Sequence, residues 1–206
     1  MPENKLIIFV KNEEAGKVKT RLAKSIGDEE ALKVYQKLIE YTHAEMVSLE
    51  INMEVWYSSY IEKDDIWDNN QFTKKLQKGD DLGQRMGNAF KTAFENGTQK
   101  TVIIGSDNAE ITSGIINEAF KSLDETDFVI GPAKDGGYYL LGMNRFYPQI
   151  FKGVEWSTKE VFEDTTRIIE QLGRSYTLLS SLNDIDTIED WKEAKDDILK
   201  NTRDHV

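Results

Sequence analysis

The sequence predicts an α/β fold in which a mostly parallel central sheet lies between two layers of helices, a three-layer α/β/α sandwich. Short apolar, β-branched runs alternate with longer segments whose apolar residues recur every three or four positions, so strands and helices alternate along the chain. Parallel neighbours need crossover connections, which these helices supply. No repeat and no Gly-, Ser- or Pro-rich linker divides the chain, so we expect one domain over residues 1–206.

Continuous apolar runs mark the strands. The run at 6–10 has a lysine on each side, which is the pattern of a strand buried on both faces of a sheet. The strands expected on this basis are, in order, 6–10, 55–58, 101–104, 128–130, the segment that begins at Tyr138, and 176–179.

Apolar stripes with a helical period mark the helices, and capping residues mark where they begin. Asp28, after Gly27, is the expected N-cap of the first helix. Capping-box spacing opens three others, at Asp81–Gln84, Ser157–Glu160 and Thr187–Asp190. The expected stripes are, in order, 31–49, 82–94, 115–123, 161–172 and 191–198.

Composition excludes several classes of protein. The 206 residues include no Cys and two His, which excludes disulfide-stapled scaffolds, zinc ribbons, thiol enzymes and iron–sulfur proteins and disfavours a His-rich metal site. A net charge of -11 opposes binding to nucleic acid or an anionic membrane surface. The apolar run at 6–10 is too short for a signal peptide or a membrane span, so we expect a cytoplasmic protein.

Ligands of such sheets bind at the carboxyl ends of strands, so the loops after the strands are the place to look for a site. In the first loop, 11–24, five cationic residues outnumber two acidic ones: Lys11, Lys17, Lys19, Arg21 and Lys24 against Glu13 and Glu14. With Gly16 among them, this loop could cradle a phosphate chain or be a solvated basic loop. No Walker or G-x-G-x-x-G signature occurs.

Three carboxylates follow other strands. Asp107 ends the 101–104 strand in a turn of small residues, where it could bind Mg²⁺ together with substrate phosphates or cap the next helix, although Thr112 is better placed as a cap. Asp184 and Asp186 would lie on one face of an extended loop, and two neighbouring carboxylates invite a divalent ion. Mg²⁺ or Mn²⁺ is therefore the expected cofactor.

The segment 131–142 contains Asp135, Gly136 and Gly137 before the expected strand at Tyr138. Paired glycines allow a second molecule to approach the backbone, or a tight hairpin turn. Tyr138 and Tyr139 alternate across that strand, so we expect at most one of them to line a pocket.

Four segments together resemble the DUF2064 family, a bacterial group of proposed glycosyltransferases similar to nucleotide-diphospho-sugar transferases of the GT-A type and, more distantly, to 2-phospholactate guanylyltransferases. The matching segments are Lys11–Ala23, Gly79–Met86, Gly105–Asp107 and Gly131–Gly142. The resemblance covers almost the whole chain and implies the GT-A-like fold.

The resemblance also implies roles for individual residues. The nucleotide would contact the first loop and the Gly79–Met86 segment; the residues concerned are Lys11, Gly16, Lys19, Thr20, Arg21, Gly83 and Arg85. Asp107 matches the strand-end metal aspartate of the superfamily, and Asp184 with Asp186 matches a D-x-D-T metal segment of the guanylyltransferase relatives. The turn at 135–137, with Tyr138, would face a small acceptor. The sequence departs from the family at Asn108-Ala109, where a Pro is usual, and at Glu13-Glu14.

The leading hypothesis is a metal-dependent glycosyltransferase that uses a nucleotide-diphosphate-sugar donor. Asp107, Asp184 and Asp186 would hold the metal, Lys19 and Arg21 would stabilise the leaving diphosphate, and Asp135 would be the base that activates an acceptor hydroxyl. Two alternatives remain open: nucleotidyl transfer from an NTP to a phosphorylated acceptor, and a non-catalytic nucleotide-binding module. The oligomeric state is left open.

Overall fold

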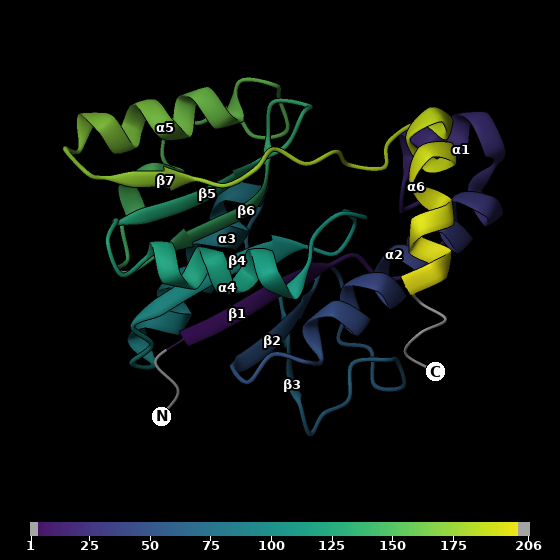
Figure 1. The fold of residues 1–206 in the computed structure, drawn as a ribbon, viewed down its shortest axis with the longest axis horizontal. Coiled ribbons are helices and arrows are strands. Elements are labelled where there is room, and N and C mark those ends of the chain that lie inside the picture. The colour runs from purple at the N-terminus through teal and green to yellow at the C-terminus, as the bar shows by residue number, and fades with distance from the viewer. Residues whose placement is uncertain (1–3, 202–206) are drawn as a thin grey trace.

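The computed structural model describes residues 4–201, with side chains described to Lys195, and confirms the α/β/α prediction. In that range the sheet has seven strands in the order β3-β2-β1-β4-β6-β5-β7 (Figure 1). Their bounds are β1 (Asn4–Val10), β2 (Asn52–Tyr57), β3 (Phe72–Leu76), β4 (Lys100–Gly105), β5 (Phe128–Pro132), β6 (Tyr138–Met143) and β7 (Tyr176–Leu178).

Strand β1 lies inside the sheet and pairs in parallel with both β2 and β4, with Ile8 opposite Val55 on one side and Ile104 on the other. Apolar side chains therefore pack on both faces of the middle strands, as their continuous apolar runs predict. Strand β6 runs antiparallel to its two neighbours, β4 and β5.

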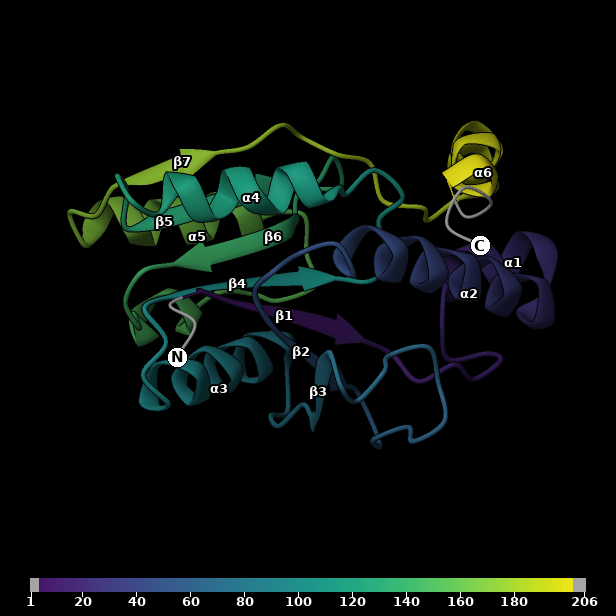
Figure 2. The same cartoon turned by 60° about the horizontal axis from the view of Figure 1, so that its bottom comes forward.

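Helices cover both faces. Their bounds are α1 (Thr20–Ile26), α2 (Asp28–Met46), α3 (Leu82–Glu95), α4 (Ser113–Ser122), α5 (Val161–Gln171) and α6 (Ile188–Asn201), with a short 3-10 helix η1 (Pro148–Phe151). Side chains of α2 and α4 form one core with the sheet, and those of α3, α5 and η1 form the other. Figure 2 shows α2 and α4 above the strands and α3 below them.

The sequence prediction lacks three elements: strand β3, helix α1 and the short 3-10 helix η1. Strand β3 carries Thr73, Lys74 and Lys75 in its middle and lacks a continuous apolar run, because it is an edge strand paired only with β2. Helix α1 lies inside the segment expected to be a loop; it has seven residues and buries only Leu22, so its apolar stripe is too short to recognise.

Several expected helix starts are confirmed and two are wrong. The side chain of Asp81 accepts from the Gln84 amide at 2.7 Å, and Asp190 and Thr187 bond reciprocally at the start of α6. The helix expected from Ser157 begins instead at Val161, since Ser157 has a left-handed backbone with φ 67°. The N-cap of α2 is Gly27, and Asp28 is already inside the helix.

A buried ion cluster ties the first three strands together. Glu54 of β2 accepts from Lys5 of β1, from Lys75 of β3 at 3.0 Å, and from the Trp56 indole at 2.9 Å. Its side chain is 4% exposed and that of Lys5 is 7% exposed, so the charges compensate one another inside the protein. We call these three charged residues the β1–β3 ion cluster. Between residues 4 and 201, no helix combines the length and the apolar character that crossing a membrane requires.

Candidate active site

Two connected cavities open along the edge of the sheet where the parallel strands end. The larger, about 780 Å³, lies between the loops after β1, β2 and β4 and the start of α3. The smaller, about 420 Å³, lies beside it. They share six lining residues, so they form one continuous hollow: Lys11, Leu82, Asp107, Tyr138, Trp156 and Ser157.

The small cavity brings together residues from all four loops that the sequence singled out. It is lined by the basic segment at 19–21, by Asp107 after β4, by Asp135, Gly137 and Tyr138 at the β5–β6 turn, and by Asp184 and Asp186 after β7. The expectation that these loops converge on one edge is therefore confirmed. The loops follow strands that end at this edge, and Tyr138 begins the antiparallel strand that runs away from it.

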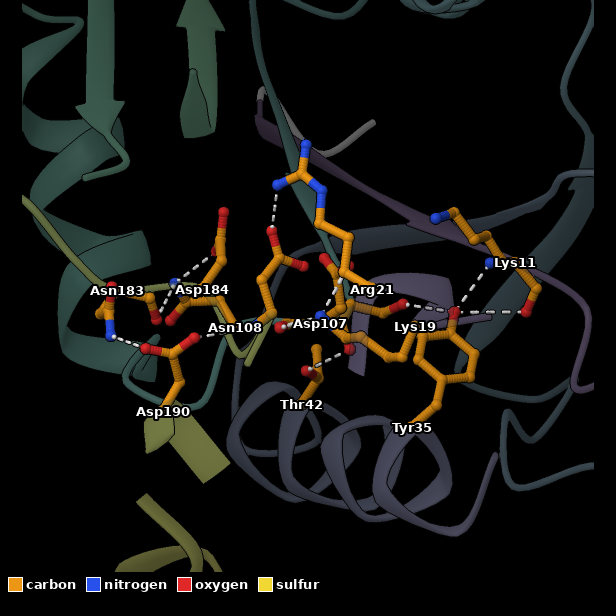
Figure 3. Close-up of polar contacts among 12 residues, drawn as sticks. Lys11, Lys19, Arg21, Tyr35, Thr42, Asp107, Asn108, Asn183, Asp184 and Asp190 are labelled. Carbon is orange, nitrogen blue, oxygen red and sulfur yellow. Dashed lines mark hydrogen bonds and ion pairs between the residues drawn. The ribbon is translucent and has the colours of Figure 1, made fainter. Parts of the chain in front are cut away.

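Lys19 and Asp107 form the centre of this arrangement (Figure 3). The Lys19 ammonium lies 3.1 Å from Asp107 Oδ2 and 3.2 Å from its carbonyl oxygen, and the lysine side chain is only 3% exposed. Lys19 adopts a left-handed backbone with φ 45° at the start of α1, a conformation that costs about 1–2 kcal/mol for a residue with a Cβ. Burial opposes ionisation of Asp107, but the ammonium groups of Lys19 and Lys11 outweigh it and lower the Asp107 pKa.

Asp184 has the opposite electrostatics. Burial and the nearby negative charge of Asp107 raise the pKa of its carboxyl to about 7, although Asn108 donates to it at 3.0 Å. The third aspartate, Asp186, accepts from Arg21 at 2.8 Å in a more exposed ion pair. Two of the three predicted aspartates thus repel each other across the cavity, while the third is neutralised by an arginine.

The 183–187 loop is held by hydrogen bonds on both sides. Asn108, 1% exposed, donates to the Asn183 carbonyl as well as to Asp184 and accepts from the Glu110 amide at 2.8 Å. Asp190 accepts from the backbone amides of Asp186 and Thr187. Sequence reasoning noted Asn108 only as a departure from the family pattern; the contact that gives it a role is 76 residues away in the chain.

The arrangement of these aspartates suits a divalent cation bound by two carboxylates, those of Asp107 and Asp184, better than one bound by all three. In the described part of the chain no group of three or more His, Cys, Asp or Glu side chains is arranged to hold a metal ion. Asp107 and Asp184, however, face one small cavity and repel each other, and Mg²⁺ commonly binds one or two carboxylates together with substrate phosphates. The donor set therefore suits a cation that arrives with a phosphorylated ligand, and the metal role stays a prediction.

The large cavity contains the other cationic groups. Lys11, Lys17 and Arg85 line it, and the Arg85 Nε donates to the Gly79 carbonyl at 3.0 Å, which leaves the rest of its guanidinium at the cavity wall. The hydroxyl of Tyr35 accepts from the Lys11 amide at 2.8 Å and lies 3.1 Å from Ser106 Oγ, so it joins the ends of β1 and β4.

Three predicted ligand glycines do not line either cavity. Gly16 lies in a turn beside Asp28. Gly83 is covered by the indole of Trp156, and a Cβ added at Gly83 would lie 2.1 Å from that ring. A Cβ added at Gly136 would lie 2.1 Å from the Lys159 carbonyl oxygen. Close packing within the protein therefore requires glycine at both of these positions.

Tyr138 and Tyr139 both border the large cavity, so the expectation that at most one would do so is wrong. They do point to opposite faces of β6: Tyr139 donates to the Ser180 carbonyl at 3.0 Å, and Tyr138 packs with the α3–α5 core. Because they are the first residues of the strand, side chains on either face reach the open edge.

Comparisons with known proteins agree with this geometry. Residues 43–158 match the family model DUF2064, described as an uncharacterized protein conserved in bacteria. No curated protein matches the chain. Among solved structures, a provisionally named nucleotide-diphospho-sugar transferase from Desulfovibrio desulfuricans G20 is 28% identical with a TM-score of 0.85, over 100% of this chain and 99% of its own.

Two more distant structures share the fold alone. The inositol-1-phosphate CTP transferase from T. maritima is 12% identical with a TM-score of 0.61, over 98% of this chain and 97% of its own. The 4-diphosphocytidyl-2C-methyl-D-erythritol synthase from Anaerococcus prevotii is 10% identical with a TM-score of 0.58, over 95% and 98%. The predicted GT-A-like fold is confirmed.

Proposed function

The chain belongs to the DUF2064 family, and from that membership and the geometry of its two cavities we propose that it is a metal-dependent glycosyltransferase that uses a nucleotide-diphosphate-sugar donor. One observation carries the proposal: buried Lys19, exposed Arg21 and the Asp107–Asp184 pair face one small cavity that opens directly into a larger one. A diphosphate needs such paired cationic and metal-binding groups, and a nucleoside needs the adjoining space.

We assign the roles as follows. The nucleoside part of the donor occupies the large cavity, whose wall carries the cations Lys11, Lys17 and Arg85 as well as the acidic side chains of Glu14, Asp80 and Asp81. Lys19 and Arg21 bind the diphosphate and stabilise the charge that it gains as it leaves. Asp107 and Asp184 would hold Mg²⁺ or Mn²⁺, which when bound supplies Lewis-acid stabilisation of that same charge.

Asp135 is the proposed general base. Its side chain lines the small cavity and accepts from the Gly137 amide at 2.9 Å, which orients the carboxylate at the tip of the turn. The acceptor hydroxyl oxygen forms a bond to the anomeric carbon, the bond from that carbon to the diphosphate breaks, and the hydroxyl proton passes to Asp135.

A second candidate is nucleotidyl transfer. It is favoured by the inositol-1-phosphate CTP transferase, which shares the fold over 98% of this chain. In that reaction the phosphate of the acceptor attacks the α-phosphate of an NTP and pyrophosphate leaves. The same cations and carboxylates would serve, so the donor decides between the two reactions.

The test is a thermal-shift screen of NTPs against UDP- and GDP-sugars, with and without Mn²⁺, followed by turnover assays with the donor that binds. We expect a sugar nucleotide to raise the melting temperature most and Asp107→Ala to abolish metal-dependent turnover. Asp124→Ala is the matched control, since Asp124 is an exposed partner of Lys100 far from the cavities. Undiminished turnover in Asp107→Ala would refute the proposal, and a preference for NTPs would favour nucleotidyl transfer.

A further inference from the structure

Trp156 lies on the boundary between the two cavities. It lines both of them, and it is part-exposed, whereas Trp56 and Trp67 are 4% and 2% exposed and belong to the cores. Trp191 is part-exposed as well, but it packs against the core on the α2–α4 face and lines neither cavity. The Trp156 indole therefore presents part of its surface to whatever occupies the hollow.

The indole is fixed in place from several sides. The ring stacks on Phe151, with centroids 6.3 Å apart and an interplanar angle of 27°. It also rests on helix α3 at Gly83, where a Cβ would have to lie 2.1 Å from it. Its backbone is held by the next two residues: Ser157 has the left-handed φ of 67°, and the Thr158 hydroxyl donates to the Glu155 carbonyl at 2.8 Å.

Apolar and charged side chains both surround the indole. Leu82, 43% exposed, and Tyr138 line the region that the two cavities share, as Trp156 does. Asp107 lines that region too, and Lys19 and Asp184 line the small cavity. A ligand that fits these groups has an anionic group joined to a ring with an apolar face. A sugar ring next to a diphosphate has this character.

We propose that Trp156 is a positioning residue whose indole stacks against the sugar ring of the donor. Gly83, which has no Cβ, lets the indole lie directly against helix α3. The proposal rests on the proposed function and adds to it the group that recognises the transferred sugar. It also gives Gly83 a role through Trp156, in place of direct contact with the nucleotide.

The experiment separates the sugar from the nucleotide. Isothermal titration gives the affinities of UDP, UDP-glucose, GDP and GDP-mannose for the wild type, Trp156→Ala and Trp156→Phe. We expect Trp156→Ala to lose about five- to tenfold in affinity for the sugar nucleotide that binds best, the size of one aromatic stacking contact, with no change for the matching diphosphate. Trp156→Phe should retain most of the wild-type affinity for that sugar nucleotide.

Gly83→Ala tests the contact between the indole and helix α3 without removing the indole. The added methyl must displace the ring, so we expect the same selective loss, whereas Gly114→Ala in α4, with no neighbour closer than 3.5 Å to the added Cβ, should behave as the wild type. An equal loss for the diphosphate and its sugar conjugate in Trp156→Ala would overturn the proposal, as would unchanged affinity.

A direct titration with glucose 1-phosphate distinguishes the two proposals. If no nucleotide binds, the proposed function fails, while quenching of tryptophan fluorescence by glucose 1-phosphate in the wild type but not in Trp156→Phe would still support the stacking role. If UDP or GDP binds to the wild type and its sugar conjugate binds no better, the stacking proposal fails and nucleotide binding stands.

Discussion

Replacing Asn108 by alanine should detach the 183–187 loop from the end of β4. The change removes the amide that donates to Asp184 at 3.0 Å and to the Asn183 carbonyl at 3.3 Å, and the oxygen that accepts from the Glu110 amide at 2.8 Å. A hydrogen bond to a charged group contributes about 1.5–3 kcal/mol and a neutral one about 0.5–1.5 kcal/mol. Counting the two shorter contacts, we expect a loss of about 2–4 kcal/mol.

The assay is urea unfolding at pH 8 with chelator present, where Asp184, with its pKa of about 7, is ionised. In a thermal melt at the same pH the midpoint should fall by roughly 4–16 °C, since a domain of this size loses about 2–4 °C per kcal/mol. Asn70→Ala is the matched control, because Asn70 also donates to a carboxylate, that of Asp68, but in an exposed turn. It should change stability by less than about 0.5 kcal/mol.

Asn108→Asp sharpens the test, since it keeps the shape of the side chain but places a third carboxylate beside Asp107 and Asp184. At pH 8 it should destabilise the protein at least as much as alanine does, because three neighbouring carboxylates repel one another when they are ionised. If both Asn108 variants unfold within about 1 kcal/mol of the wild type, the loop does not depend on this bridge, and the reasoning is refuted.

Three further predictions concern the rest of the fold. Glu54→Gln leaves the lysines of the β1–β3 ion cluster without their anion, so it should lower the free energy of chemical unfolding by about 3–5 kcal/mol. Glu30→Gln in an exposed ion pair should lower it by at most about 1 kcal/mol, and similar losses in the two variants would contradict the prediction. Burial opposes ionisation of Asp127, but hydrogen bonds outweigh it and lower its pKa. The stability that Asp127→Asn removes should therefore be fully present at pH 6, begin to fall below the unfolded value of about 3.9, and be lost as pH falls through the lower folded pKa; a gap that does not shrink from pH 6 downward would exclude this cause. Gly131→Ala should lower stability by about 1–3 kcal/mol in urea, because its Cβ would lie 2.3 Å from a tyrosine ring, and an unchanged midpoint would show that the ring moves freely.

The sequence predicted the central sheet well because its middle strands are buried on both faces. The run 6–10 has no polar residue to interrupt it, so burial and strand propensity indicate the same structure. Strand β3 was missed for the converse reason: an edge strand with two adjacent lysines is stabilised by pairing with β2 and by the β1–β3 ion cluster, neither of which is visible in local sequence.

The candidate site was predictable where its residues lie in the loops that follow strands. Lys19, Asp107, Asp135 and Asp184 were found because topology places loop residues at a known edge. The positions of Gly83 and Gly136 were predicted to contact ligand, but glycine is required there by Trp156 and by the Lys159 carbonyl. Packing between segments so far apart in the chain leaves no local pattern.

The reversed direction of β6 fixes the backbone on one side of the hollow. Strands β1, β3, β4 and β7 lead into helices through loops, but β5 returns at once as β6 through a turn closed by the Ala133 amide on the Gly137 carbonyl at 3.0 Å. The Gly136 carbonyl also accepts from the Phe162 amide at the start of α5. Backbone hydrogen bonds thus hold this turn both to itself and to α5, which gives this side of the hollow a rigid backbone.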